Sequence, residues 1–266
     1  MAVQNRVFEI KTIKGVVLKN LFEVVKQYIK ETNFVVGPGG LEISSIDSSE
    51  NSITFVKLDA QKFESFESKR VCVFGIDTVV LYKTIKSCNK REIVTMYMNE
   101  GEEESFYIEL SDIDIGKRKV YKIPVLDLPV GKVNAQDIEY SSVMNMSTSQ
   151  FQQIVKDIGV LDGRIVEIKS IGKRLILSCT DGVAEFKTTI NEDVVETGKE
   201  SLIKFLANSE NIVQGRFKVS YLTNFIKASH LCENMNILLS NDSPLTLEYY
   251  VADLGILRLM LIPFTE

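Results

Sequence analysis

Four segments with helical periodicity, in a chain otherwise patterned for strands, share one arrangement of apolar residues and lysine. They span residues 15–30, 77–88, 147–159 and 219–229. In each, two apolar positions four residues apart are followed directly by lysine: Leu21, Val25 and Lys26; Leu81, Ile85 and Lys86; Phe151, Val155 and Lys156; Leu222, Ile226 and Lys227. Residues four apart lie on one helix face, so the pattern predicts four helices that pack an apolar stripe against a sheet. Ser147 begins the third segment with the pattern of a capping box.

The shared lysine lies on the exposed side of each predicted helix, because at about 100° per residue it points ~140° away from the first apolar position. Together the four segments carry seven lysines and three acidic residues, a net charge of +4. The whole chain of 266 residues has 31 Lys and Arg against 36 Asp and Glu, so its net charge is −5 and the remainder carries −9. This partition excludes a protein that grips nucleic acid with its entire surface, and it predicts that the helices face a polyanion.

The other segments are short runs of β-branched, aromatic and alternating apolar residues, bounded by Gly, Asn, Asp or Ser, which are typical of strands. Helix and strand segments recur in the same order in both halves, which indicates an internal repeat. The segment between the halves contains Pro124, Pro129 and several apolar residues, so it predicts an extended connector along a surface groove. We predict an α+β fold of duplicated domains, with domains at residues 1–124 and 139–266 and a connector at residues 125–138.

Residue types that carry catalysis are scarce in the sequence. Motifs for phosphate-binding loops, zinc proteases and nucleophile elbows are missing, and His230 is the only histidine. Residues 37–40 and the acidic residues 102–104 have the pattern of hairpin turns. The cysteines form no C-x-x-C pair, which indicates free thiols in a reducing compartment; they are Cys72, Cys88, Cys179 and Cys232. We predict a protein that is not an enzyme and has no catalytic residue, metal or cofactor.

No stretch of about 18 apolar residues occurs, which argues against a membrane span. The N-terminal residues 1–14 lack the apolar core of a secretion signal. We therefore predict an intracellular protein without a membrane partner.

Several pieces of the chain, taken in order, resemble one known family. They are the turn at residues 46–49, the fourth helix at residues 220–228, the last hairpin at residues 243–249 and 251–255, and the tail at residues 261–263. With the fourfold helix pattern, they make the chain similar to the DNA sliding clamps of the proliferating-cell-nuclear-antigen (PCNA) type, from about residue 6 to residue 263. The resemblance implies a closed homotrimeric ring, with sheets outside and two helices per domain on the inner face.

The function implied by this resemblance is that of a processivity factor that encircles duplex DNA and tethers replication and repair proteins. Its implied partners are a DNA polymerase, other proteins with short PCNA-interacting motifs, and a clamp loader, in the nucleus or in a viral replication compartment. Phosphates would be contacted without base readout by Lys19, Lys26, Lys83, Lys86, Lys156 and Lys227. Asn20 and Ser220 depart from the family's basic pattern, which implies a less positive pore.

The resemblance also implies a pocket for partner peptides and a seam between subunits. The pocket residues would be Ile46, Glu50, Leu126, Leu128, Val133, Pro244, Met260, Ile262 and Pro263. Glu50 and Met260 depart from the family's usual His and Tyr, which implies a different partner preference. The seam would pair a strand near residues 117–123 with one near residues 184–190 of the neighbour; its residues would be Lys117, Lys119, Tyr121, Ala184, Phe186 and Thr188.

Two alternatives remain open at this level. The four departures are compatible with a PCNA-like processivity or checkpoint-type clamp subunit that acts as a monomer, dimer or heteromer. The second alternative is a nuclease that uses the acidic residues 102–104, although the chain has few residue types suited to catalysis.

Overall fold

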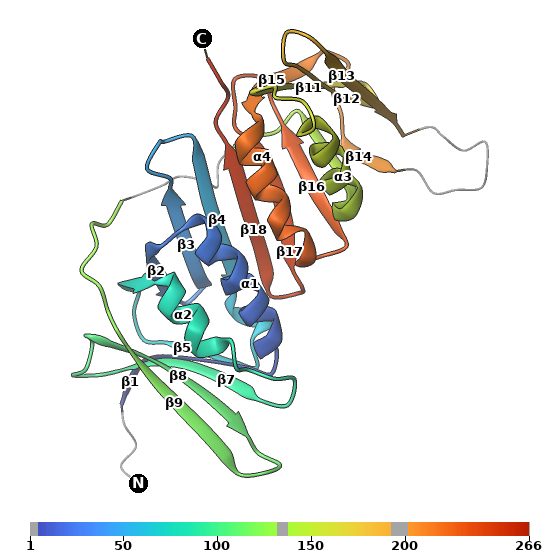
Figure 1. The fold of residues 1–266 in the computed structure, drawn as a ribbon. Coiled ribbons are helices and arrows are strands. Elements are labelled where there is room, and N and C mark those ends of the chain that lie inside the picture. The colour runs from blue at the N-terminus through green and yellow to red at the C-terminus, as the bar shows by residue number, and fades with distance from the viewer. Residues whose placement is uncertain (1–4, 132–137, 193–201, 266) are drawn as a thin grey trace. The chain divides into compact units, whose positions relative to one another are not determined.

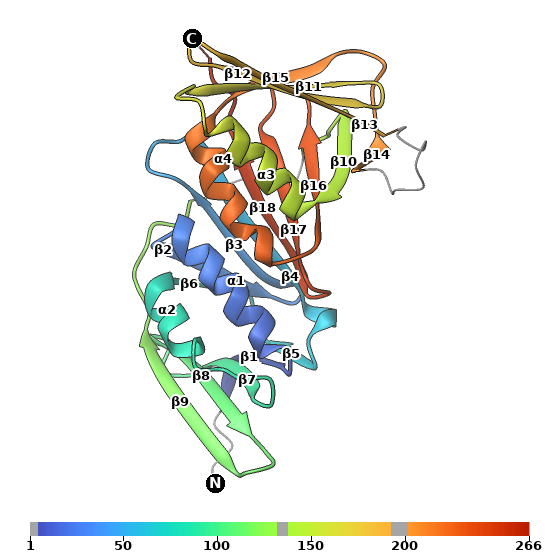
Figure 2. The same cartoon turned by 45° about the vertical axis from the view of Figure 1, so that its right-hand side comes forward.

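A computed structural model describes residues 5–131, 138–192 and 202–265 of the chain (Figures 1 and 2). The chain forms two compact units. Unit 1 contains Met1–Ser45, Thr54–Val133 and Val251–Leu257, and unit 2 contains Ile46–Ile53, Asn134–Tyr250 and Arg258–Glu266. Each unit combines two helices with antiparallel strands, so the fold is α+β. No helix among the described residues is long and apolar enough to cross a membrane.

Unit 1 is built on two sheets, with the strand orders β5-β1-β7-β8-β9 and β4-β3-β2-β6. Helices α1 and α2 lie side by side in this unit (Figures 1 and 2). The elements are β1 (Arg6–Thr12), α1 (Gly15–Tyr28), β2 (Glu31–Gly37), β3 (Gly40–Ile46), β4 (Ser52–Asp59), the 3-10 helix η1 (Ala60–Lys62), β5 (Ser65–Ser68), β6 (Cys72–Asp77), α2 (Thr78–Ile85), β7 (Ile93–Asn99), β8 (Ser105–Asp112) and β9 (Lys117–Pro124).

An aromatic cluster joins the layers of unit 1. The ring of Phe74 lies 5.6 Å from that of Phe8 and 5.3 Å from that of Phe106, both on the other sheet. Phe34 lies 5.9 Å from Phe74 and 6.1 Å from Phe22 of α1. Burial of each such side chain stabilises the fold by about 1.5–3 kcal/mol. The cluster therefore fixes α1 on the sheets and leaves its opposite face to solvent.

Unit 2 repeats the element order and the sheet topology of unit 1. Its sheets have the orders β14-β10-β16-β17-β18 and β13-β12-β11-β15, so β10 corresponds to β1, β13 to β4 and β18 to β9. The elements are β10 (Ser142–Ser147), α3 (Thr148–Ile158), β11 (Ile165–Ile171), β12 (Arg174–Thr180), β13 (Glu185–Asn191), β14 (Ile203–Ala207), β15 (Val213–Lys218), α4 (Val219–Phe225), the 3-10 helix η2 (Ile226–His230), β16 (Asn234–Leu239), β17 (Leu245–Val251) and β18 (Gly255–Leu261). The internal repeat predicted from the sequence is confirmed.

The helix pattern is confirmed in all four segments. Every one of its eight apolar positions is buried, and its lysines are half-buried (Lys26) or exposed (Lys86, Lys156 and Lys227). Asp77 caps α2, because its carboxylate accepts hydrogen bonds from Val79 N and Val80 N at 2.8 and 2.9 Å. The capping box predicted at Ser147 is wrong: its hydroxyl lies 2.9 Å from the hydroxyl of Ser149 and makes no capping bond to the helix.

The predicted hairpin turns are also confirmed. Residues 38 and 39 join β2 to β3, and the acidic residues 102–104 join β7 to β8. Gly40 has φ +140, and a Cβ there would overlap the carbonyl oxygen of Leu58. Glycine at this position lets the hairpin lie against β4.

Candidate nucleic-acid interface

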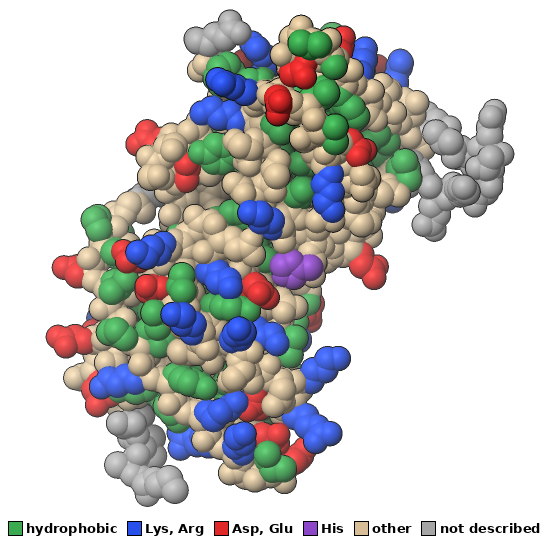
Figure 3. Space-filling model, in the orientation of Figure 1, with side chains coloured by type: hydrophobic (Ala, Val, Ile, Leu, Met, Phe, Trp, Pro, Cys, Tyr) green, Lys and Arg blue, Asp and Glu red, His purple; other side chains and the backbone are tan. Residues whose placement is uncertain are grey.

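Unit 1 presents four of the predicted DNA-facing lysines on α1 and α2. Figure 3 shows Lys and Arg side chains gathered over these two helices. Lys26 Nζ lies 3.6 Å from the centre of the Tyr82 ring, and the Tyr82 hydroxyl donates to Glu23 at 2.7 Å. Lys19 Nζ donates to the carbonyl oxygen of Cys88 at 3.4 Å. Lys83 and Lys86 are exposed and, within the part of the chain that the structure describes, form no ion pair.

Unit 2 presents the other two predicted lysines, Lys156 of α3 and Lys227 of η2, both exposed. Lys227 Nζ donates to Asn224 Oδ1 at 2.9 Å. Ser220, where the resemblance would place a basic residue, is exposed on α4. Unit 2 therefore offers fewer cations on its helices than unit 1.

Two further exposed cations lie outside the helical pattern and were not among the predicted contacts. Lys90 and Arg91 are exposed in the turn that joins α2 to β7. The sequence signal that could have revealed them is the adjacent pair of cations directly after a lysine-bearing helix. A third, Lys14, precedes α1 and pairs with Asp253 at 2.8 Å, so its charge is offset.

The connector lies along β6 in unit 1. Leu126 N donates to Gly75 O at 2.9 Å, and Asn33 Nδ2 donates to Pro129 O at 2.9 Å. A Cβ at position 75 would overlap Leu126 O and would lie 2.8 Å from Leu128 Cγ, so only glycine lets the connector approach this closely. The predicted pocket residues Leu126 and Leu128 are half-buried here, whereas Val133 is outside the described residues.

The remaining predicted pocket residues belong to unit 2. Ile46 is 44% and Ile262 37% exposed; Glu50 is also exposed, and Pro244 and Pro263 are half-buried. Met260 is only 1% exposed, and its neighbours Leu259 and Leu261 on β18 are buried as well, so its side chain offers almost no surface to a partner. The tail is held by its backbone, since Ile262 N donates to Asn51 O at 2.9 Å and Phe264 N to Arg216 O at 2.7 Å.

The turn before β4 is organised by the Asp47 carboxylate. It accepts hydrogen bonds from Ser49 N, Asn51 N and Ser52 N, and from the hydroxyl of Tyr221 on α4 at 2.9 Å. Partial burial alone would raise the pKa of Asp47, but these hydrogen bonds outweigh it and the pKa lies below its ordinary value. The carboxylate thus fixes both the turn that carries Ile46 and Glu50 and its contact with α4.

The two predicted seam strands are both edge strands. β9 ends one sheet of unit 1 and β13 ends one sheet of unit 2, so each has one unpaired side. Lys117 and Ala184 are exposed, Phe186 and Thr188 are half-buried, and Ala184 lies one residue before β13.

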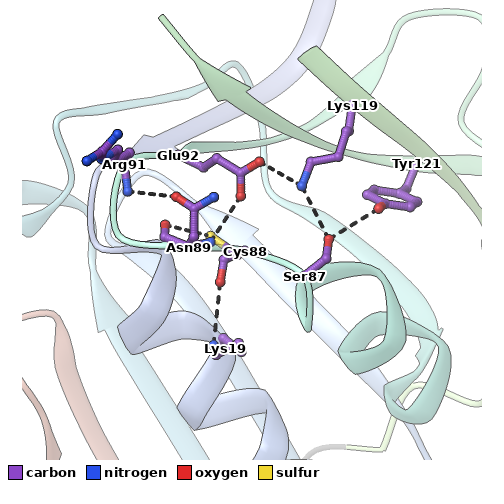
Figure 4. Close-up of polar contacts among 8 residues, drawn as sticks. All are labelled: Lys19, Ser87, Cys88, Asn89, Arg91, Glu92, Lys119 and Tyr121. Atoms are coloured by element: carbon purple, nitrogen blue, oxygen red, sulfur yellow. Dashed lines mark hydrogen bonds and ion pairs between the residues drawn. The ribbon is translucent and has the colours of Figure 1, made fainter. Parts of the chain in front are cut away.

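Lys119 and Tyr121 of β9 contact the end of α2 in their own unit (Figure 4). Lys119 Nζ lies 2.6 Å from Glu92 Oε1 and donates to Ser87 Oγ at 3.4 Å, and the Tyr121 hydroxyl lies 3.3 Å from Ser87 Oγ. Glu92 is 2% exposed. Burial alone would raise the pKa of Glu92, but the hydrogen bonds from Lys119 and Asn89 N outweigh it and the pKa is lowered.

The acidic and cysteine side chains that could carry catalysis or bind a metal show little sign of doing so. Within the described ranges, no group of three or more His, Cys, Asp or Glu side chains could hold a metal ion. Glu102 accepts from the Tyr107 hydroxyl at 2.7 Å, and Glu103 pairs with Arg70 at 2.6 Å. All four cysteines are free, and burial raises the pKa of each thiol, which disfavours the nucleophilic thiolate.

Comparisons with known proteins agree with the duplicated fold. Residues 7–131 match the family described as "Proliferating cell nuclear antigen, N-terminal domain", and residues 134–264 match "Proliferating cell nuclear antigen, C-terminal domain". The "Probable DNA polymerase sliding clamp 1" of Paramecium bursaria Chlorella virus 1 is 23% identical over 262 residues, which cover 97% of each chain. Matches to both domains, in order and over nearly the whole duplicated fold, show that the chain belongs to the PCNA family of sliding clamps, the non-enzymatic processivity factors of DNA replication.

Proposed function

We propose that three copies of this chain close into a ring around duplex DNA and tether DNA polymerase and other replication and repair proteins, without catalysis of their own. The observation that carries the proposal is the fourfold helix pattern, because it places lysine on the exposed face of every helix segment in a chain of net charge −5. Contact with phosphates through such lysines is independent of sequence and lets a protein slide. The proposed contacts are Lys19, Lys26, Lys83, Lys86, Lys156 and Lys227.

The repeated topology supports a seam between β9 of one copy and β13 of the next. In unit 1, the segment Val251–Leu257 lies against β4, since Asp59 N donates to Leu254 O at 2.9 Å. That segment contains the start of β18, whose counterpart in the repeat is β9, and the counterpart of β4 is β13. The same kind of pairing between two copies would therefore join β9 to β13. A closed ring would then leave neither edge exposed.

We further propose that partner proteins dock by a short motif on the connector, the Asp47 turn and the tail. Ile46, Leu126 and Ile262 supply apolar surface. The proposal includes domains at residues 1–124 and 139–266, joined by a connector at residues 125–138. We also propose that a clamp loader places the ring on DNA. The ring would act in the nucleus or in a viral replication compartment.

The ring is tested by solution mass and by retention on DNA. At micromolar concentration we expect a mass three times the 30.0 kDa of one chain. Once loaded, the protein should remain on a nicked circle at high salt and slide off after linearisation, because a ring is held by topology and not by counterion release. A mass of one or two chains, or equal loss from both DNA forms, would favour the subunit that acts without a ring.

Peptide docking is tested at Ile262. We expect Ile262→Asp to weaken binding of a peptide of the form Q-x-x-[apolar]-x-x-aromatic-aromatic at least about tenfold, since a charge would replace an apolar contact. The backbone bond of Ile262 to Asn51 is retained, so the fold should not change. Isothermal titration calorimetry measures the affinity, with Val160→Asp as the control because Val160 is 82% exposed and outside the proposed pocket. Equal affinities for the two variants would contradict docking at the tail.

A further inference from the structure

The turn between α2 and β7 carries two cations without a protein partner. We call residues 89–91 the basic turn. Lys90 and Arg91 are exposed, and neither side chain forms an ion pair or hydrogen bond within the described ranges 5–131, 138–192 and 202–265. Two other exposed cations of unit 1 differ, since Lys69 pairs with Glu100 and Arg70 with Glu103, both at 2.6 Å. The basic turn therefore holds two uncompensated positive charges.

The backbone of the basic turn is fixed by a hydrogen-bond network (Figure 4). Asn89 Oδ1 accepts from Arg91 N at 2.9 Å, and Glu92 Oε2 accepts from Asn89 N at 3.0 Å. The other oxygen of Glu92 pairs with Lys119 at 2.6 Å. Because Lys119 offsets the charge of this neighbouring acid, Glu92 holds the turn in place without neutralising Lys90 and Arg91.

The basic turn is continuous with the lysine-bearing helices. Lys19 of α1 donates to the carbonyl oxygen of Cys88, the residue directly before the turn, at 3.4 Å. Lys86 lies only four residues before Lys90 along the chain and is exposed. One of the proposed DNA contacts thus bonds to the residue that directly precedes the basic turn.

We infer that Lys90 and Arg91 bind backbone phosphates of duplex DNA, in addition to the six helix lysines; this inference rests on the proposed function. The guanidinium of Arg91 offers the planar fork that matches phosphate oxygens, and Lys90 adds a point charge. A turn already fixed by Asn89 and Glu92 loses little conformational entropy when it meets a phosphate. Each phosphate contact steepens the salt dependence of DNA binding by about 0.9.

The test uses the full chain with Lys90→Ala and Arg91→Ala combined. Its binding to a short fluorescent duplex is followed by anisotropy over a salt series. We expect the slope of log K against log salt to become shallower by about 1.8 for each copy that contacts the duplex. Lys69→Ala with Arg70→Ala is the matched control, because it removes the same charge from ion-paired residues of the same unit and should leave the slope unchanged. Arg91→Lys should retain most of the slope, since the charge remains.

The outcomes separate this inference from the proposed function. An unchanged slope for Lys90→Ala with Arg91→Ala, while the wild-type chain binds DNA in a salt-dependent way, overturns the inference and leaves the proposed function standing. A lower oligomeric mass with an unchanged slope also overturns it, because the basic turn would then contact another copy. Absence of salt-dependent binding by the wild-type chain overturns both. Thermal unfolding of each variant confirms that the fold is retained.

Discussion

Alanine at all six helix lysines is expected to reduce DNA affinity by about three orders of magnitude at moderate salt, and to remove most of its salt dependence. Six phosphate contacts correspond to a slope of roughly −5 in log K against log salt, and each lost cation removes its share of the counterion release. The variant changes Lys19, Lys26, Lys83, Lys86, Lys156 and Lys227. Anisotropy with a fluorescent duplex measures both quantities. Oligomeric mass should be unchanged, because none of these residues lies on β9 or β13.

The control is a second sextuple variant with the same change of charge. It replaces lysines on strands and turns: Lys11, Lys57, Lys69, Lys169, Lys173 and Lys204. If binding depends on the helix faces, this control keeps most of the wild-type affinity and slope. Equal losses in the two variants would show that only the total charge matters, and the proposed interface would be abandoned.

Glu92→Ala is expected to lower the free energy of unfolding by about 2–4 kcal/mol. The change leaves the ammonium of Lys119 without its carboxylate in a largely buried site and removes the acceptor for Asn89 N. Breaking a buried pair by deleting one partner costs far more than breaking an exposed one. Chemical denaturation measures the difference. Glu103→Ala is the matched control, because its pair with Arg70 is exposed on both sides and should contribute under about 1 kcal/mol.

The pH dependence follows from the lowered pKa of Glu92. A carboxyl whose pKa is lower in the folded state contributes stability above its unfolded pKa, near 4.3, and that stability is lost as the pH falls through the folded value. The stability difference between wild type and Glu92→Gln should therefore shrink on acidification below that point. A difference that stays constant down to strongly acidic pH would show that the Glu92 carboxylate is not the stabilising group.

The helices and hairpins could be predicted because their signals are local. Leu21 and Val25 lie four residues apart on one face, and both are buried as the pattern predicts. Residues 37–40 are glycine and proline, which favour tight turns, and they form the turn between β2 and β3. The capping box failed because a serine hydroxyl can bond to a neighbouring side chain as well as to the helix backbone, and Ser147 bonds to Ser149. The sequence pattern alone does not show which of these two partners the serine hydroxyl will bond to.

The sequence can name candidate site residues, but it cannot show what their side chains contact in the folded chain. Lys119 is predicted to lie at the seam, and the sequence pattern does not reveal that its ammonium also meets Glu92, 27 positions earlier in the turn before β7. Met260 is predicted to line the pocket, yet its side chain is only 1% exposed, in a part of β18 where consecutive residues are all buried. The basic turn was missed because Lys90 and Arg91 have no periodicity to reveal them. In each case the answer depends on which elements pack together.

The unequal charge of the two repeats has a consequence for motion along DNA. Unit 1 holds four of the six helix lysines and the basic turn, whereas unit 2 holds two lysines. In the proposed ring of three copies, strongly and weakly cationic segments alternate around the hole, so the electrostatic potential has three minima per revolution and not six. Fewer, deeper minima give a rougher energy profile for rotation-coupled sliding. One-dimensional diffusion should therefore be slower than in a ring whose repeats are equally charged, and should accelerate as salt is added.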